Sequence, residues 1–82
     1  MSGFWLQLDT EHQPGNVEIV QYHLDRPEYR NLVDEVGDVP FDQDDVDKAL
    51  KDAVNLAIQA GWYVYGEWEV LPDSYVAPVV PV

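Results

Sequence analysis

The sequence contains no cysteine. Disulfide bonds, thiolate metal ligands and thiol catalysis are therefore excluded. No window approaches the roughly 18 consecutive apolar residues of a membrane-spanning helix, and no charged-then-apolar leader begins the chain. We therefore expect a cytoplasmic protein without a membrane partner, located in the host cytoplasm if a phage encodes it.

Basic residues are scarce. Four Lys and Arg stand against sixteen Asp and Glu, which gives a net charge of −12. Nucleic acids and anionic membranes carry the same sign of charge, so we expect no direct binding to either, and a basic protein is the natural partner. Two other interpretations stay open: the charge serves solubility, or it reflects adaptation to high salt. A composition of ten Asp and only two Lys is consistent with adaptation to high salt.

Catalytic groups are few and poorly placed. The hydroxyl groups of Ser2, Thr10 and Ser74 fall in a terminus, a turn and a tail, and none sits at a strand-to-helix elbow beside His12 or His23. Paired carboxylates are abundant, but a chain this short has little room for a substrate cleft between them. We therefore expect no enzyme, no catalytic residues and no cofactor.

The run from Asp42 to Asp47 superficially resembles a calcium-binding loop. In an EF-hand loop that began at Asp42, the fifth, sixth and twelfth positions would be Val46, Asp47 and Ala53, where a ligand, a glycine and a glutamate are required. No glycine-rich phosphate loop is present either. We expect no dedicated metal site.

The strongest pattern covers residues 42–71 and predicts a helix, a glycine stop and a strand. Asp42 is a suitable N-cap for a helix over residues 43–60, and Gly61 can end it in the left-handed conformation. Apolar residues recur at steps of three and four and so share one face: Val46, Leu50, Ala53, Ala57 and Ala60, widened by Ala49, Val54 and Leu56.

Residues 62–71 alternate at period two and predict a strand. One set should face the helix: Trp62, Val64, Trp68 and Val70. The other set should face outward: Tyr63, Tyr65, Glu67 and Glu69. Gly66 among such large residues indicates a bulge or room for a neighbouring ring.

The first 24 residues predict a hairpin. Residues 4–9 alternate as a half-buried strand, residues 10–16 contain turn signals, and residues 17–24 form a second strand. Val17 and Ile19 favour one face of that second strand, but Val20, Tyr22 and Leu24 favour the other. A bulge near Ile19–Val20 would resolve the conflict.

Residues 25–36 predict a short helix, because Asp25 could cap it, Pro27 lies in its first turn and Glu28 is at the capping-box position. An irregular connection is the alternative. After Leu71, prolines at positions 78 and 81 argue against a central strand. We expect residues 72–82 to be an extended tail, either loose or laid along the body.

These elements predict one α+β domain over residues 1–82. Its order is β-β-(α)-α-β, with a three-stranded antiparallel sheet in order 2-1-3 and the main helix on one face.

Acidic clustering is the one functional signal above background. Seven of the fourteen residues from 34 to 47 are acidic, and none is basic. Together with two glutamates of the last strand, they form the predicted partner-binding set: Asp34, Glu35, Asp38, Asp42, Asp44, Asp45, Asp47, Glu67 and Glu69. Ten aromatic residues exceed what the inner faces can absorb. We therefore add Trp5, Tyr63 and Tyr65 as aromatic contacts of an interface. The alternative is that the tail over residues 75–82, or a second copy of the chain, covers them.

Two hypotheses follow. In the first, the chain is a non-enzymatic inhibitor that blocks a basic, nucleic-acid-handling protein by mimicking a phosphate backbone, in the manner of anti-restriction or anti-CRISPR proteins from phages. In the second, it is an assembly module or accessory subunit, homodimeric through the outer sheet face and tail, and acidic for solubility or halophily.

Overall fold

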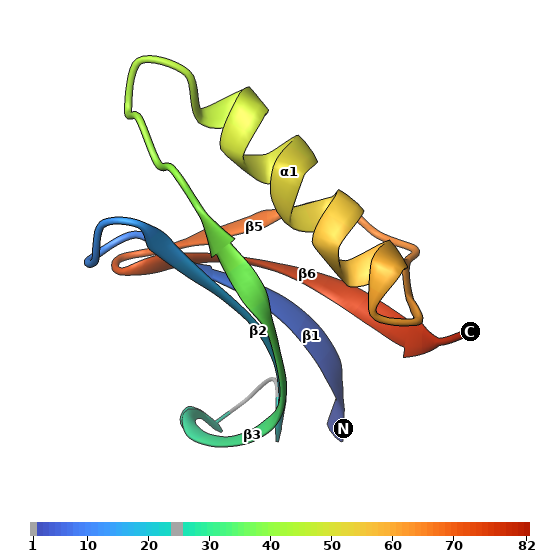
Figure 1. Ribbon diagram of the computed structural model, residues 1–82. Helices are drawn as coiled ribbons and strands as arrows, with labels where there is room; N and C mark the ends of the chain where they lie inside the picture. Colours follow the sequence, from blue (N-terminus) through green and yellow to red (C-terminus); the bar gives the residue numbers. More distant parts are fainter. Residues whose placement is uncertain (1, 24–25) are drawn as a thin grey trace.

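The structure is a computed structural model that describes the backbone of residues 2–23 and 26–82, and the side chains of residues 3–21 and 30–82. Within these residues the elements are β1 (Ser2–Asp9), β2 (Gly15–His23), β3 (Arg26–Val39), α1 (Val46–Gln59), β4 (Trp62–Val64), β5 (Glu69–Leu71) and β6 (Ser74–Pro81). The six strands form one antiparallel sheet in the order β3-β2-β1-β6-β4, and β5 also pairs with β6 (Figure 1). The predicted α+β class is confirmed, whereas the three-stranded sheet in order 2-1-3 is wrong.

The predicted hairpin is present, with β1 and β2 paired from Ser2↔His23 to Leu8↔Val17. Leu6, Leu8, Val17 and Ile19 lie on the face that α1 covers, whereas Trp5 and Val20 lie on the opposite face, here called the outer face. Strand β2 carries apolar residues on both faces because Val17 and Ile19 are buried on the inner face and Val20 is buried on the outer face. The ladder between β2 and β3 is irregular at Ile19/Val20, where β3 carries the additional residue.

Residues 26–36 were predicted to be a helix, and this prediction is wrong: they belong to the long strand β3. The predicted cap, Asp25, lies outside the described residues. The helical pattern fails because pairing with β2 outweighs local propensity, and because Val33, Val36 and Val39 suit an extended backbone. Three register shifts against β2 bend the strand. These shifts, and not a helical turn, explain the uneven spacing of the apolar residues in β3.

The expected C-terminal tail is in fact β6, a central strand between β1 and β4/β5. Pro78 is tolerated because of its position. Its carbonyl accepts a hydrogen bond from the Tyr65 amide, 3.2 Å away. Because the nitrogen and the carbonyl of one strand residue point to the same side, the Pro78 nitrogen also faces the side of β4 and β5, at the gap between the residues that pair with β5 and those that pair with β4. The nitrogen of Pro81 faces the other edge, beyond Phe4↔Val79, the last described pair with β1. Neither proline removes a ladder hydrogen bond.

The predicted strand over residues 62–71 is divided into β4 and β5, with residues 65–68 crossing between them. The predicted inward packing is confirmed for Trp62, Val64 and Trp68, which pack against the core beneath α1. It is wrong for Val70, which is 73% exposed in the short strand β5. Gly66 lies against the ring of Pro78. The predicted room for a ring beside this glycine is therefore confirmed.

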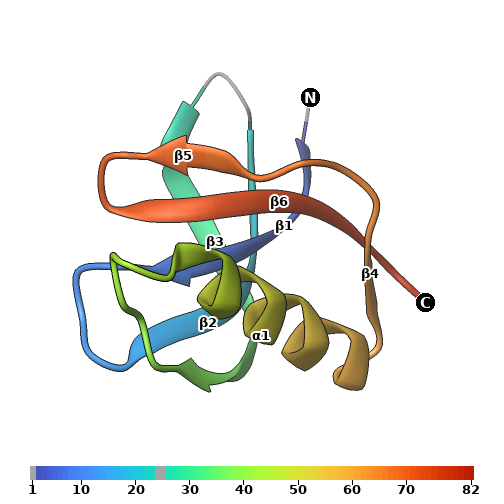
Figure 2. The same cartoon turned by 90° about the horizontal axis from the view of Figure 1, so that it is seen from above.

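Helix α1 lies across one face of the sheet (Figure 2) and contacts both edge strands, β3 and β4, as well as β1 and β2. Its buried face consists of Ala49, Ala53 and Ala57, whose small side chains let the helix approach the sheet closely. The helix begins three residues later than predicted and ends at Gln59, with Ala60 as its C-cap. Gly61 follows with a φ of 92°, which confirms the predicted left-handed stop.

Candidate partner-binding surface

Residues 34–47, here called the acidic segment, run from the end of β3 through a loop into the first turn of α1. Six of their seven carboxylates are exposed, and that of Asp34 is half-buried. Among the residues whose side chains the structure describes, the lysine–carboxylate pair is Lys48–Asp52, at 3.1 Å, and it includes none of the seven. The segment therefore presents its charge to solvent without an ion pair to any described lysine or arginine side chain.

Backbone hydrogen bonds shape the loop before the helix. The Asp42 carboxylate accepts from the Asp44 amide at 2.9 Å, and the Asp42 carbonyl accepts from the Asp45 amide at 3.0 Å. The Asp45 carboxylate accepts from the Lys48 amide at 3.4 Å and is the N-cap of α1. The prediction that Asp42 caps the helix is wrong, because Asp42 instead closes the turn that precedes the cap.

Gln13, in the β1–β2 loop, holds the other end of this turn. Its side-chain amide donates to the Phe41 carbonyl, and its oxygen accepts from the Phe41 amide at 3.3 Å. Phe41 itself is buried in the core beneath α1, and its ring lies 6.2 Å from the ring of Tyr75 in a tilted arrangement. The acidic segment is thus fixed to the body of the protein just before its densest charge.

The predicted glutamates of the last strand lie elsewhere. Glu67 is in the crossing between β4 and β5, and Glu69 is in β5, at the opposite edge of the sheet from β3. Cross-strand register nevertheless connects Glu69 to Glu35 through one row of residues: Glu69, Val76, Gln7, Glu18 and Glu35. Since directly opposed residues share a face, this row crosses the outer face from edge to edge.

Glu18, the member of that row that lies on β2, was not predicted as a site residue. Burial and the neighbouring carboxylates of Glu35 and Asp9 raise its pKa, while the Arg30 guanidinium opposes the shift. Arg30 donates a hydrogen bond to the buried side chain of Gln7. No sequence signal joined these residues, because their proximity depends on register between three strands.

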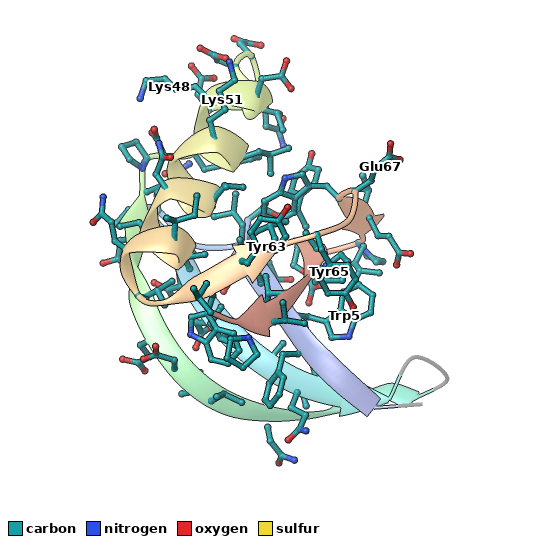
Figure 3. The ribbon with its side chains drawn as sticks, turned by 90° about the vertical axis from the view of Figure 1, so that its right-hand side faces the viewer. Trp5, Lys48, Lys51, Tyr63, Tyr65 and Glu67 are labelled. Atoms are coloured by element: carbon teal, nitrogen blue, oxygen red, sulfur yellow. The ribbon has the colours of Figure 1, made fainter. Side chains whose placement is uncertain are left out.

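The three predicted aromatic contacts differ in exposure. Tyr63 and Tyr65 are 57% and 60% exposed, as predicted, and Figure 3 shows them with Trp5 and Glu67 on the side of the molecule that bears β4 and β6. Trp5 does point away from α1, but it is only 8% exposed, because Val20, Val76 and Leu71 pack around it on the outer face. It offers little surface to a partner.

Neither a metal centre nor a membrane span is found in the part of the chain that is described. No group of three His, Asp or Glu side chains there could hold a metal ion, and no helix there is long and apolar enough to cross a bilayer. His12 forms a 2.9 Å hydrogen bond with the Asp9 carboxylate on an exposed loop, and the side chain of His23 lies outside the described set.

The fold and surface define a small α+β protein with a six-stranded antiparallel sheet, one helix and an exposed acidic segment. Comparison with protein-family models, curated proteins and solved structures finds no match to this chain.

Proposed function

We propose that this chain is a non-enzymatic binding protein that inhibits a basic, nucleic-acid-binding protein by occupying its phosphate-binding groove. The observation that carries this proposal is the acidic segment, whose carboxylates are exposed, lack ion pairs with described cations and stand on a backbone held by hydrogen bonds. Ordered negative groups on a rigid body are what a groove built for phosphates would recognise.

The spacing of the carboxylates supports mimicry of a phosphate backbone. Residues three or four apart on a helix have Cβ atoms about 5–6 Å apart. Adjacent strands lie about 4.8 Å apart, and this is the spacing of the opposed pair Glu18 and Glu35, whereas Glu69 lies further along the same row, beyond Gln7 and Val76. Neighbouring phosphates along a nucleic-acid strand are separated by a comparable distance.

The net charge of −12 supports the same partner class, since it attracts Lys and Arg over long range and speeds association with a basic surface. The chain itself would not bind nucleic acid. It would act in the cytoplasm, as an inhibitor of restriction or CRISPR machinery would, and it would need neither a cofactor nor a catalytic residue.

A pull-down from host extract, eluted with a salt gradient, tests the proposal. We expect a basic protein to elute at elevated salt, to be displaced by duplex DNA or RNA, and to bind less well after Asp42, Asp44, Asp45 and Asp47 are changed to Asn. Asn preserves the helix cap and removes only charge. An affinity for the partner that changes neither with salt concentration nor with these substitutions would refute phosphate mimicry.

A second candidate function is an assembly module that forms a homodimer, and one exposed pair favours it. Tyr63 in β4 lies directly opposite Val80 in β6, and the two are 57% and 42% exposed at the edge of the sheet. Val80 belongs to the expected C-terminal tail, but two other residues of that tail, Val76 and Val79, are buried within β6 and are not available to a second copy. Sedimentation at several concentrations separates the candidates, since a strict monomer excludes the dimer.

A further inference from the structure

A groove lies between α1 and the segment that crosses from β4 to β5. It has a volume of about 410 Å³ and is lined by Asp47, Leu50, Lys51, Val54, Asn55 and Trp68. Five of these residues come from one side of the helix, at steps of three and four, and Trp68 faces them from the crossing segment. The groove begins where the acidic segment ends.

The lining combines apolar walls with a single carboxylate. Leu50 and Val54, one helical turn apart, and the ring of Trp68 provide apolar surface, and Asp47 provides a negative group at the end nearer the helix N-terminus. An arginine side chain matches this combination. Its methylene groups pack on aliphatic surface, its planar guanidinium stacks on an indole, and its paired N–H groups bind a carboxylate.

Lys51 is the one feature that opposes a cation in the groove. It lies four residues after Asp47, the spacing of a helical ion pair, yet no ion pair joins the two side chains, whereas Lys48 is paired with Asp52 at 3.1 Å. Figure 3 shows Lys48 and Lys51 together on the N-terminal half of α1. Because only Lys51 lines the groove, these two residues form a matched pair for a test.

We propose that this groove binds an arginine side chain of the basic partner. The inference rests on the proposed function and adds an anchor to it. A second copy of the chain is a poor occupant, because two bodies of charge −12 repel each other, and Arg30, the arginine whose side chain is described, is engaged with Gln7 on the outer face. Stacking on Trp68 makes the groove selective for arginine over lysine, which a purely electrostatic surface would not be.

The probes are three capped tripeptides, Gly-Arg-Gly, Gly-Lys-Gly and Gly-Leu-Gly, titrated at low salt while the indole N–H signals of all three tryptophans are followed by NMR. We expect the arginine peptide to shift the Trp68 signal, to leave Trp5 and Trp62 unshifted, and to bind about threefold to tenfold more tightly than the lysine peptide. Equal binding of the two cationic peptides without a Trp68 shift, or preferred binding of the leucine peptide, would overturn the proposal.

Two pairs of variants separate the groove from general charge. Asp47→Asn should weaken arginine binding about twofold to fivefold, and Asp44→Asn, which removes the same charge outside the groove, should change it less. Lys51→Gln should strengthen binding more than Lys48→Gln does. Equal effects within each pair would contradict the proposal.

These peptide results do not depend on the pull-down. Arginine selectivity with no basic partner in host extract would refute the proposed function and leave the groove assignment intact. The converse result is a captured partner whose binding is salt-sensitive but is changed by Asp47→Asn and Lys51→Gln no more than by their control variants. That result would refute the groove assignment and leave the proposed function intact.

Discussion

The side-chain amide of Gln13 forms two hydrogen bonds with the backbone of Phe41, one to its carbonyl and one from its amide. The two residues are 28 positions apart, and the contact ties the β1–β2 loop to the chain immediately before the loop of Asp42, Asp44 and Asp45. The order of the acidic segment therefore depends on a neutral residue outside it.

Gln13→Ala should loosen that segment. Loss of both bonds leaves two partly buried backbone groups of Phe41 without their partner, which costs about 1–2 kcal/mol in free energy of unfolding. The amide of Phe41 should also exchange faster with solvent hydrogen. Gln43→Ala is the control, because Gln43 is exposed in the same loop and should change stability by less than about 0.5 kcal/mol. Equal effects of the two substitutions would show that Gln13 does not hold the loop.

Gly66→Ala tests the packing of the crossing segment on β6. A Cβ at this position would overlap the ring of Pro78, which cannot move without moving the strand. We expect a loss of about 1–3 kcal/mol in free energy of unfolding by chemical denaturation. Gly3→Ala is the control, because its Cβ would lie 3.7 Å from Trp5 Nε1, an ordinary contact. A neutral Gly66→Ala would mean that the crossing segment does not lie on Pro78.

Glu18→Gln should stabilise the protein at neutral pH. Burial first, and then the carboxylates of Glu35 and Asp9, raise the pKa of Glu18 in the folded state, so between the ordinary glutamate pKa and the raised one the folded state binds a proton more strongly than the unfolded state does. Stability therefore falls as pH rises from the ordinary glutamate pKa through the raised one. The melting temperature of Glu18→Gln should exceed that of the wild type at neutral pH, and the difference should vanish in acid. Glu11→Gln, on the exposed hairpin loop, removes the same charge and is the control, and an equal gain in that variant would assign the effect to net charge. A gain that persists in acid would assign the effect to packing instead.

The parts of the fold that could be predicted are those that local pattern determines. The apolar spacing of α1, the stop at Gly61 and the alternation that begins at Trp62 each lie within a short window. The structure follows the first two, and it follows the third as far as β4. The acidic segment was visible for the same reason, since its residues are neighbours in the sequence.

The remaining features depend on contacts between distant residues. Pro78 argues against a central strand until the gap between β4 and β5 is known, and Val33 and Val36 read equally well as part of a helix until β2 is placed beside them. Trp5 was expected to be exposed because nothing in its own strand predicts cover from Val20 and Val76. Glu18 joins Glu35 only through register.

The central claim is that the position of the carboxylates, and not their number, makes the recognition surface. Two variants of equal charge test it: Asp42→Asn/Asp44→Asn/Asp47→Asn within the acidic segment, and Glu11→Gln/Asp52→Asn/Asp73→Asn outside it. Both retain the Asp45 cap. The measurement is the affinity of each for the captured basic partner over a series of salt concentrations. The account predicts that the first variant binds at least about tenfold more weakly than the second and has a shallower salt dependence, as expected when fewer charged contacts form. Equal affinities and equal salt slopes for the two variants would contradict it.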